Sequence, residues 1–167
     1  MIKKKICLLG SFAVGKTSVI KQYVHGIFSE KYLTTIGVKI DRKQIETEAG
    51  PVLLLIWDLN GADKFADIRS SYLKGSSGFL LVVDGTRPST LMRALEISES
   101  LDQTLGHLPR ILLINKSDLS SEWRLAETDL EPLLSQGWTI LKTSAKTGEH
   151  VEQAFSQLTR AMLESEG

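Results

Sequence analysis

Cysteine is nearly absent from this chain of 167 residues, because Cys7 is the single one and it lies inside the apolar run 6–9. One cysteine excludes an internal disulfide and a metal cluster held by several thiolates. A chain without disulfides fits a reducing compartment, so we expect a cytoplasmic protein.

An excess of charge is also missing, since 20 Lys and Arg balance 20 Asp and Glu. A chain without a basic field lacks the general attraction that nucleic-acid-binding proteins use, and we expect no nucleic-acid partner. The histidines His25, His107 and His150 are scattered, and no two have the spacing of metal ligands. No apolar run approaches the ~20 residues that cross a bilayer, and residues 163–167 carry no cysteine for a lipid. We therefore expect no intrinsic membrane anchor.

The apolar residues that are present fall into short runs separated by helical segments. At this length we expect a single domain spanning residues 1–167. The nearly continuous apolar runs predict strands that are buried on both faces, and we expect Lys3, Lys4 and Lys5 to form the solvated start of the first strand. Over 37–48 apolar and polar residues alternate, which predicts a half-exposed edge strand that pairs antiparallel with the next strand. The fold class is therefore α/β, a six-stranded and mostly parallel sheet with one antiparallel edge strand and helices on both faces. The runs are 6–9, 52–57, 79–83, 111–114 and 138–141, and helical periodicity marks 17–24, a segment starting near Pro88, and 151–162.

The segment 10–17 reads Gly-Ser-Phe-Ala-Val-Gly-Lys-Thr, a complete G-x-x-x-x-G-K-T pattern between a strand and a helix. Gly10 and Gly15 let the backbone curl so that N–H groups point at phosphate oxygens, and the following helix adds its positive N-terminal dipole. Lys16 supplies a charge for the outer phosphates, and Thr17 a hydroxyl ligand for Mg²⁺. We assign nucleotide binding here to Ser11, Ala13, Val14, Gly15, Lys16, Thr17 and Ser18. The alternative is a glycine-rich turn that carries a lysine by chance.

A carboxylate and a glycine follow the second apolar run. Asp58 lies where a buried strand ends, at the edge where open α/β sheets place their ligands, and it can hold Mg²⁺ directly or through water. Gly61 has no side chain to keep a backbone N–H away from a terminal phosphate. The alternative for Asp58 is a cap on the next helix.

Two polar segments that follow the last two runs point to guanine. Asp118, in the segment Asn115-Lys116-Ser117-Asp118, can accept hydrogen bonds from N1–H and the exocyclic amino group of guanine, a pair of donors that adenine lacks. The aliphatic stem of Lys116 can lie across a flat base. The segment Thr143-Ser144-Ala145-Lys146 can present backbone N–H groups to the guanine carbonyl, so Ser144, Ala145 and Lys146 join the binding residues. Each segment alone could be an ordinary polar turn.

With these motifs in order, residues 5–162 resemble the small GTPases of the Ras superfamily. The matching residues are 10–17, Phe28, Tyr32, 34–37, Trp57, Asp58, Gly61, 115–118 and 143–146. Segment 28–38 looks most like the Rab branch, whereas 13–17 also suits the Rho branch, which leaves the branch open. The resemblance implies a P-loop G domain with about five helices that binds GTP, GDP and Mg²⁺.

The resemblance also implies roles in switching and partners. Thr35 would close on Mg²⁺ and the γ-phosphate, Gly61 would anchor the second switch segment, and both segments would be released when that phosphate is lost. Phe28 would pack against the base and Tyr32 would lie over the phosphates. Effector proteins would bind 30–45 and 63–72, with an exchange factor and a GTPase-activating protein acting on the same cycle.

Two residues depart from the family pattern. Ala62 stands where the water-orienting glutamine belongs, and a methyl group cannot orient the attacking water. Phe12 replaces a small residue and could crowd the γ-phosphate or a partner's arginine. Catalysis would then rest on Lys16, Thr35 and Gly61. The sequence leaves three hypotheses: a GTP switch with slow intrinsic hydrolysis, a non-cycling GTP-bound recruitment module, and a kinase with the same loop. Asp118 and the lack of an insertion for a second substrate argue against the kinase.

Overall fold

The computed structural model describes residues 1–29, 38–59 and 70–165, and its centre is a six-stranded sheet in the order β2-β3-β1-β4-β5-β6. Neighbouring strands are parallel except β2 and β3, which pair antiparallel from Val38 opposite Leu59 to Thr47 opposite Gly50. The predicted α/β class and the antiparallel edge strand are thus confirmed. The strands are β1 (Ile2–Gly10), β2 (Val38–Thr47), β3 (Gly50–Leu59), β4 (Gly78–Asp84), β5 (Arg110–Asn115) and β6 (Ile140–Lys142).

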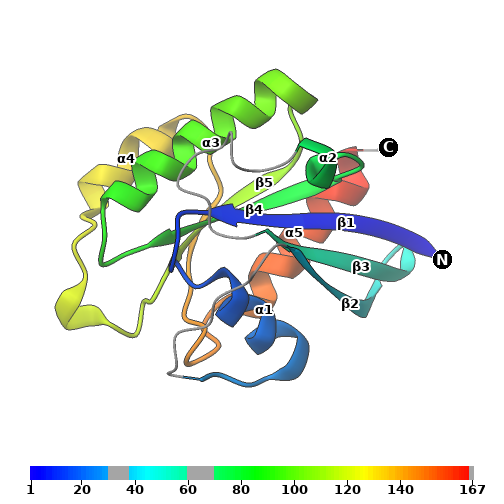
Figure 1. The fold of residues 1–167 in the computed structure, drawn as a ribbon, viewed down its shortest axis with the longest axis horizontal. Helices are drawn as coiled ribbons and strands as arrows, with labels where there is room; N and C mark the ends of the chain where they lie inside the picture. The colour runs from blue at the N-terminus through cyan, green and yellow to red at the C-terminus, as the bar shows by residue number, and fades with distance from the viewer. Residues whose placement is uncertain (30–37, 60–69, 166–167) are drawn as a thin grey trace.

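Helices cover both faces of the sheet (Figure 1). The helices are α1 (Lys16–His25), α2 (Ser70–Leu73), α3 (Ser89–Leu105), α4 (Glu127–Ser135) and α5 (Val151–Ser165), with a 3₁₀ turn η2 at Ser120–Glu122. One core joins α1 and α5 to the sheet around Phe155, and a second joins α3 and α4 to the opposite face around Phe79. Both rings are fully buried. Phe79 begins the apolar run 79–83, and Phe155 belongs to the segment 151–162, whose helical spacing predicted a buried face.

β1 begins earlier than its apolar run. The expectation of a solvated lysine start is wrong for Lys4, which is 3 % exposed, and for Lys5, which is only partly exposed. The Lys5 ammonium lies 3.6 Å from the centre of the Trp57 ring and donates a hydrogen bond to the Tyr72 carbonyl at 2.6 Å. Strand pairing from Ile2 opposite Val52 therefore extends through the lysines, because their stems and charges find partners beside the sheet.

Two elements near the C-terminal end differ from the sequence pattern. α4 has only Leu130 and Leu133 buried and contains Pro132, so its periodicity is too weak to predict a helix. β6 starts two residues later than the run 138–141, because the Trp138 N–H donates to the Leu133 carbonyl and belongs to the turn after α4. None of the helices in the described ranges has the length and apolar character that a bilayer crossing requires.

Candidate functional site

The carboxyl ends of the central strands meet at one edge of the sheet. Asp58 of β3 lies beside Leu8 of β1, and Asp84 of β4 lies beside Asn115 of β5. All three polar side chains are at most 2 % exposed. The segment 10–17 continues from β1 at this edge, so the topology brings the sequence-predicted motifs together.

The loop between β1 and α1 has the backbone of a phosphate-binding loop. Ala13 and Gly15 have φ of 63° and 102°, and α1 starts directly after Gly15. A Cβ on Gly15 would lie 2.4 Å from Asn115 Nδ2, so both the φ and the contact require glycine. The curled loop ends at the N-terminus of a ten-residue helix, a place that favours anions.

Lys16 lies buried over this loop. Its ammonium donates to the carbonyls of Gly10 and Ser11, both at 3.3 Å, and the residue is 6 % exposed. Burial lowers the pKa of Lys16 to about 8, while the charge of Asp58 acts in the opposite direction. A buried ammonium is better stabilised by an anion than by two long bonds to carbonyls, so this loop fits a polyphosphate.

Thr17 and Asp58 form the side of the site that suits a cation. The Thr17 hydroxyl donates to Asp58 Oδ2 at 2.5 Å, which places a hydroxyl and a carboxylate oxygen together next to the buried Lys16. Oxygen ligands of this kind are those that Mg²⁺ takes, and few protein ligands suffice because it keeps phosphate oxygens and waters. The donor set therefore fits the expected Mg²⁺.

The predicted base-binding segments are joined to each other and to the loop. Asn115 donates to the Val14 carbonyl at 3.0 Å and accepts from the Thr143 hydroxyl at 3.1 Å. The Ser144 hydroxyl donates to Asp118 Oδ1 at 2.7 Å, and Asp118 is otherwise exposed. Asn115 thus holds neighbouring loops, whereas the Asp118 carboxylate is oriented at the surface, where a base can reach it.

The other predicted site residues occupy varied positions. Ser11 and Val14 are buried in the loop, Ser18 is half-buried in the first turn of α1, Ala145 is buried, and Lys146 is exposed. Gln22 of α1 donates to the Ala145 carbonyl at 2.8 Å, which fixes that segment beside α1. Phe28 and Phe12 are 38 % and 49 % exposed. The predictions for Tyr32, Thr35, Gly61 and Ala62 lie outside the described residues.

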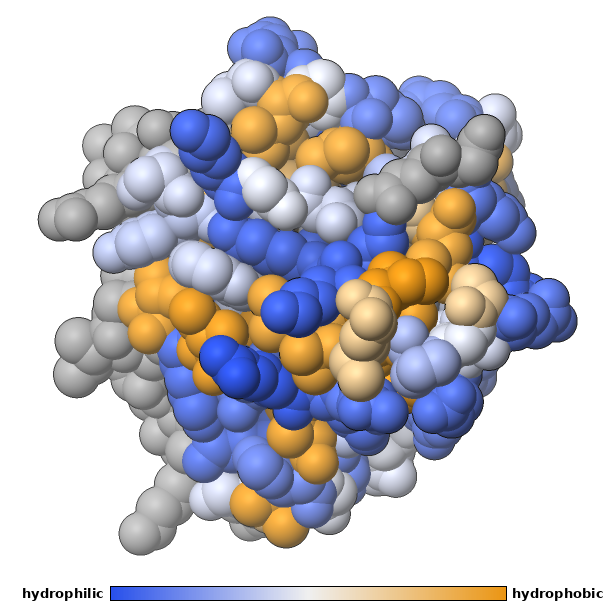
Figure 2. All heavy atoms as spheres, turned by 90° about the vertical axis from the view of Figure 1, so that its right-hand side faces the viewer, coloured by the Kyte–Doolittle hydropathy of each residue, from blue (hydrophilic) through white to orange (hydrophobic). Residues whose placement is uncertain are grey.

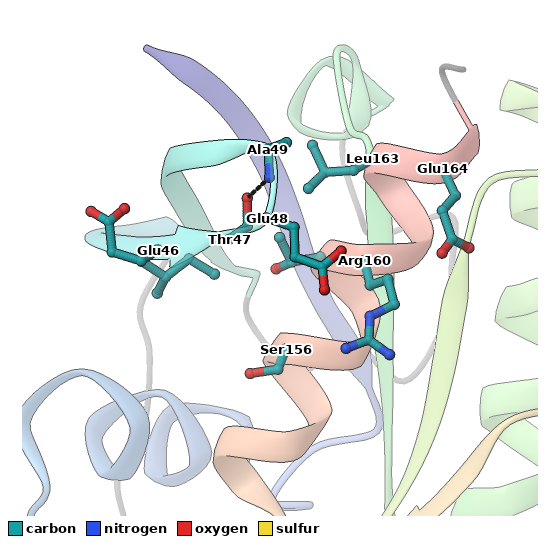
Figure 3. Close-up of a pocket in the computed structure, with 10 residues that line it drawn as sticks. Glu46, Thr47, Glu48, Ala49, Ser156, Arg160, Leu163 and Glu164 are labelled. Atoms are coloured by element: carbon teal, nitrogen blue, oxygen red, sulfur yellow. Dashed lines mark hydrogen bonds between the residues drawn. The ribbon is translucent and has the colours of Figure 1, made fainter.

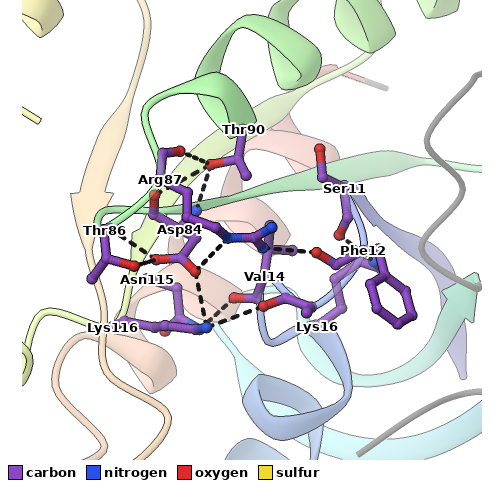
Figure 4. Close-up of polar contacts among 11 residues, drawn as sticks. Ser11, Phe12, Val14, Lys16, Asp84, Thr86, Arg87, Thr90, Asn115 and Lys116 are labelled. Atoms are coloured by element: carbon purple, nitrogen blue, oxygen red, sulfur yellow. Dashed lines mark hydrogen bonds and ion pairs between the residues drawn. The ribbon is translucent and has the colours of Figure 1, made fainter. Parts of the chain in front are cut away.

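Sequence reasoning missed two residues at this edge, Asp84 and Arg87 (Figure 4). Asp84 directly follows the buried run 79–83, the same signal that identified Asp58. Its carboxylate is 2.9 Å from the Lys116 ammonium and 3.0 Å from Arg87 Nε. Burial opposes its ionisation, but hydrogen bonds from Thr86, Lys116 and Arg87 outweigh that effect and hold its pKa below the usual value. Arg87 carries no comparable signal in the sequence.

A separate groove of about 680 Å³ lies at the opposite end of the sheet. It runs between the β2–β3 hairpin and the C-terminal half of α5, with Ile45 and Leu163 in its lining and Glu48 and Arg160 at its sides (Figure 3). Seen from the end of the molecule that carries the N-terminus, apolar areas are small and separated by hydrophilic residues (Figure 2). The groove carries none of the motif residues, so the candidate site remains at the carboxyl edge.

Comparison with known proteins agrees with these motifs. The sequence model of the Ras family matches residues 5–164. Two relatives come from Dictyostelium discoideum. The Ras-related protein Rab-32C is 34 % identical over 168 residues, covering 98 % of this chain and 75 % of the relative. The Ras-related protein Rab-32B is 34 % identical over 170 residues, covering 96 % of this chain and 64 % of the relative.

Proposed function

Because the chain belongs to the Ras family and is Rab-like, we propose that it is a GTP-binding switch whose intrinsic hydrolysis is slow. The observation that carries the proposal is the arrangement at the carboxyl edge. There, the buried Lys16 and the Thr17–Asp58 pair lie at one end of the loop. Asp118, which accepts a hydrogen bond from the Ser144 hydroxyl, lies on the other side of the loop. The first end suits phosphates with a cation, and the second suits a guanine edge.

Each part of the binding site has a separate task in this proposal. Lys16, already charged and buried, binds the outer phosphates, and the N–H groups of 13–17 bind phosphate oxygens. Thr17 and Asp58, with Thr35, would hold Mg²⁺, which neutralises phosphate charge when bound. Asp118 selects guanine because another base would leave its carboxylate without the paired donors.

Slow hydrolysis follows from Ala62 and Phe12. The remaining candidate catalytic residues, Lys16, Thr35 and Gly61, can stabilise charge on the γ-phosphate, but none of them replaces the side-chain amide that orients water. The Phe12 side chain, half exposed at the rim of the loop, is placed to hinder an arginine supplied by a partner. The site would therefore retain GTP better than it cleaves it.

Partner proteins would bind the GTP-bound form and would change which nucleotide is bound. Rab-like proteins act through effectors, exchange factors and activating proteins, and we assign effector contacts to residues 30–45 and 63–72. Of this surface, Ile40 is 48 % exposed on the free edge of β2. An activating protein would have to supply the water-orienting group that Ala62 lacks.

Single-turnover hydrolysis of bound GTP tests the proposal. We expect the native chain to cleave GTP slowly, and Ala62→Gln to raise the rate by about tenfold or more, because one positioned polar group is worth at least that factor in a transition state. Ala49→Gln, the same substitution at an exposed position of the β2–β3 turn at the opposite end of the sheet, is the matched control and should leave the rate unchanged.

Undetectable cleavage in the Ala62→Gln protein would overturn the self-terminating switch. That result would favour the alternative hypothesis, a GTP-bound recruitment module that does not cycle. Transfer of the γ-phosphate to a small acceptor would instead revive the kinase hypothesis.

A further inference from the structure

Asp84 is the centre of a cluster of hydrogen bonds behind the phosphate loop. Its Oδ1 accepts from the Thr86 N–H at 2.8 Å and the Thr86 hydroxyl at 2.6 Å. Its Oδ2 faces the Lys116 ammonium at 2.9 Å and accepts from Arg87 Nε at 3.0 Å. Asp84 is 1 % exposed, so one buried carboxylate fixes both cations (Figure 4).

The same cations reach the loop. Arg87 Nη2 donates to the Phe12 carbonyl at 2.7 Å, and Lys116 donates to the Ala13 carbonyl at 3.1 Å. The next carbonyl, that of Val14, accepts from Asn115 at 3.0 Å. Three consecutive carbonyls of the loop are therefore held from outside, by Arg87 after β4, by Asn115 at the end of β5 and by Lys116 directly after it.

Peptide geometry turns these contacts into an orientation of the loop. In a planar trans peptide the N–H points away from the preceding C=O, and the described residues contain no cis peptide. Holding the carbonyls of Phe12, Ala13 and Val14 outward therefore directs the N–H groups of the following residues, 13–15, to the opposite side. That side is the concave one, over which Lys16 is folded.

We propose that Arg87 is a positioning residue for the phosphate loop: by holding the Phe12 carbonyl outward, it keeps the Ala13 N–H directed at the phosphates and lengthens the residence of the bound nucleotide. The inference rests on the proposed function. Arg87 does this through two nitrogens of one fork, with Nε on Asp84 and Nη2 on Phe12. A guanidinium can make both bonds in a fixed geometry, which a lysine cannot.

The test is the rate at which fluorescent GDP leaves the protein in excess unlabelled GDP and Mg²⁺. Arg87→Ala should accelerate release about tenfold, in line with the loss of a hydrogen bond from a charged donor. This rate is measured only on molecules that hold nucleotide, so a smaller folded fraction does not imitate the effect. Arg87→Gln, which keeps most of the stem but not the fork, should also accelerate release and serves if Arg87→Ala does not fold.

Two comparisons separate positioning from general damage. Arg93→Ala removes another arginine–carboxylate pair, that with Glu96 on α3, and should release GDP at the native rate. The ratio of GDP to IDP affinity should be unchanged in Arg87→Ala, because the base contacts of Asp118 are untouched. Release within about twofold of the native rate in both Arg87 variants, or a changed GDP to IDP ratio, would overturn the inference. A native chain that binds no guanine nucleotide would overturn the proposed function as well.

Discussion

At the scale of single residues, the candidate site is built from charges that the fold has already removed from water. Lys16, Asp58 and Asp84 are each at most 6 % exposed, although isolated buried charges are costly. Each is stabilised by neighbours: carbonyls for Lys16, the Thr17 hydroxyl for Asp58, and two cations for Asp84. Burial of this kind keeps the groups oriented before a ligand arrives, which reduces the cost of binding.

Asp118→Asn should move base preference from guanine towards xanthine. An amide can donate to the C2 carbonyl of xanthine, where the carboxylate accepts from the amino group of guanine. We expect the ratio of GDP to XDP affinity to fall by at least about tenfold, measured by competition against a fluorescent nucleotide. Glu99→Gln, a neutralised exposed carboxylate on α3, is the control. A variant that still prefers GDP over XDP to the native extent would show that Asp118 does not bind the base.

The sequence predicted the site residues whose roles can be read from their immediate neighbours in the chain. Asp58 could be predicted because it follows an apolar run, and Lys16 because it stands in a spaced glycine motif. The bond between Arg87 and Phe12 joins residues 75 positions apart, and it exists only because β4 lies beside β1. The spacing of residues around Phe12 or around Arg87 does not predict this hydrogen bond.

At the scale of elements, the connection between β4 and α3 is fixed by close packing as well as by charge. A Cβ on Gly85 would lie 2.1 Å from the Trp123 ring, and the Arg124 N–H donates to the Gly85 carbonyl at 2.9 Å. The segment after η2 therefore presses directly on the backbone that leads to Arg87. Only glycine permits this contact.

Gly85→Ala should lower the free energy of unfolding by about 1–3 kcal/mol, because a rigid indole ring cannot yield to the added methyl group. Gly78→Ala is the matched comparison. There the nearest atom is the Met162 sulfur at 2.8 Å, on a flexible side chain that can change rotamer, so the loss should be smaller. Urea unfolding of both variants measures the difference. An equal or larger loss in Gly78→Ala would contradict this account of the packing at Gly85.

Helices and strands with strong apolar patterns could be predicted from the sequence. Elements that depend on contacts with distant parts of the chain could not. The runs of β4 and β5 are buried on both faces and agree with the sequence within one residue at each end. The start of β1 depends on Lys5 finding Trp57 and Tyr72, and the helix α4 depends on two leucines packing on the second core. Such partners are known only once the chain is folded.

At the scale of the whole molecule, the sheet gathers the functional loops at one edge. β1, β3, β4 and β5 end together there, whereas the hairpin between β2 and β3 lies at the other end (Figure 1). The groove between this hairpin and α5 is therefore also at that other end. The order of strands thus places the loop, the Thr17–Asp58 pair and the Asp118 carboxylate, to which we assign polyphosphate, cation and base binding, at the same edge of the sheet. The central claim is that this ligand is a guanine nucleotide bound with Mg²⁺.

Competition against bound fluorescent GDP, with Mg²⁺ and then with EDTA, tests that claim most directly. We predict that GDP and GTP displace the probe at concentrations at least about a hundredfold lower than ADP and ATP, because adenine cannot supply the donors that Asp118 requires. EDTA should accelerate release, since Thr17 and Asp58 would lose the cation they share with the phosphates. Displacement by ADP as readily as by GDP, with release insensitive to EDTA, would contradict the account.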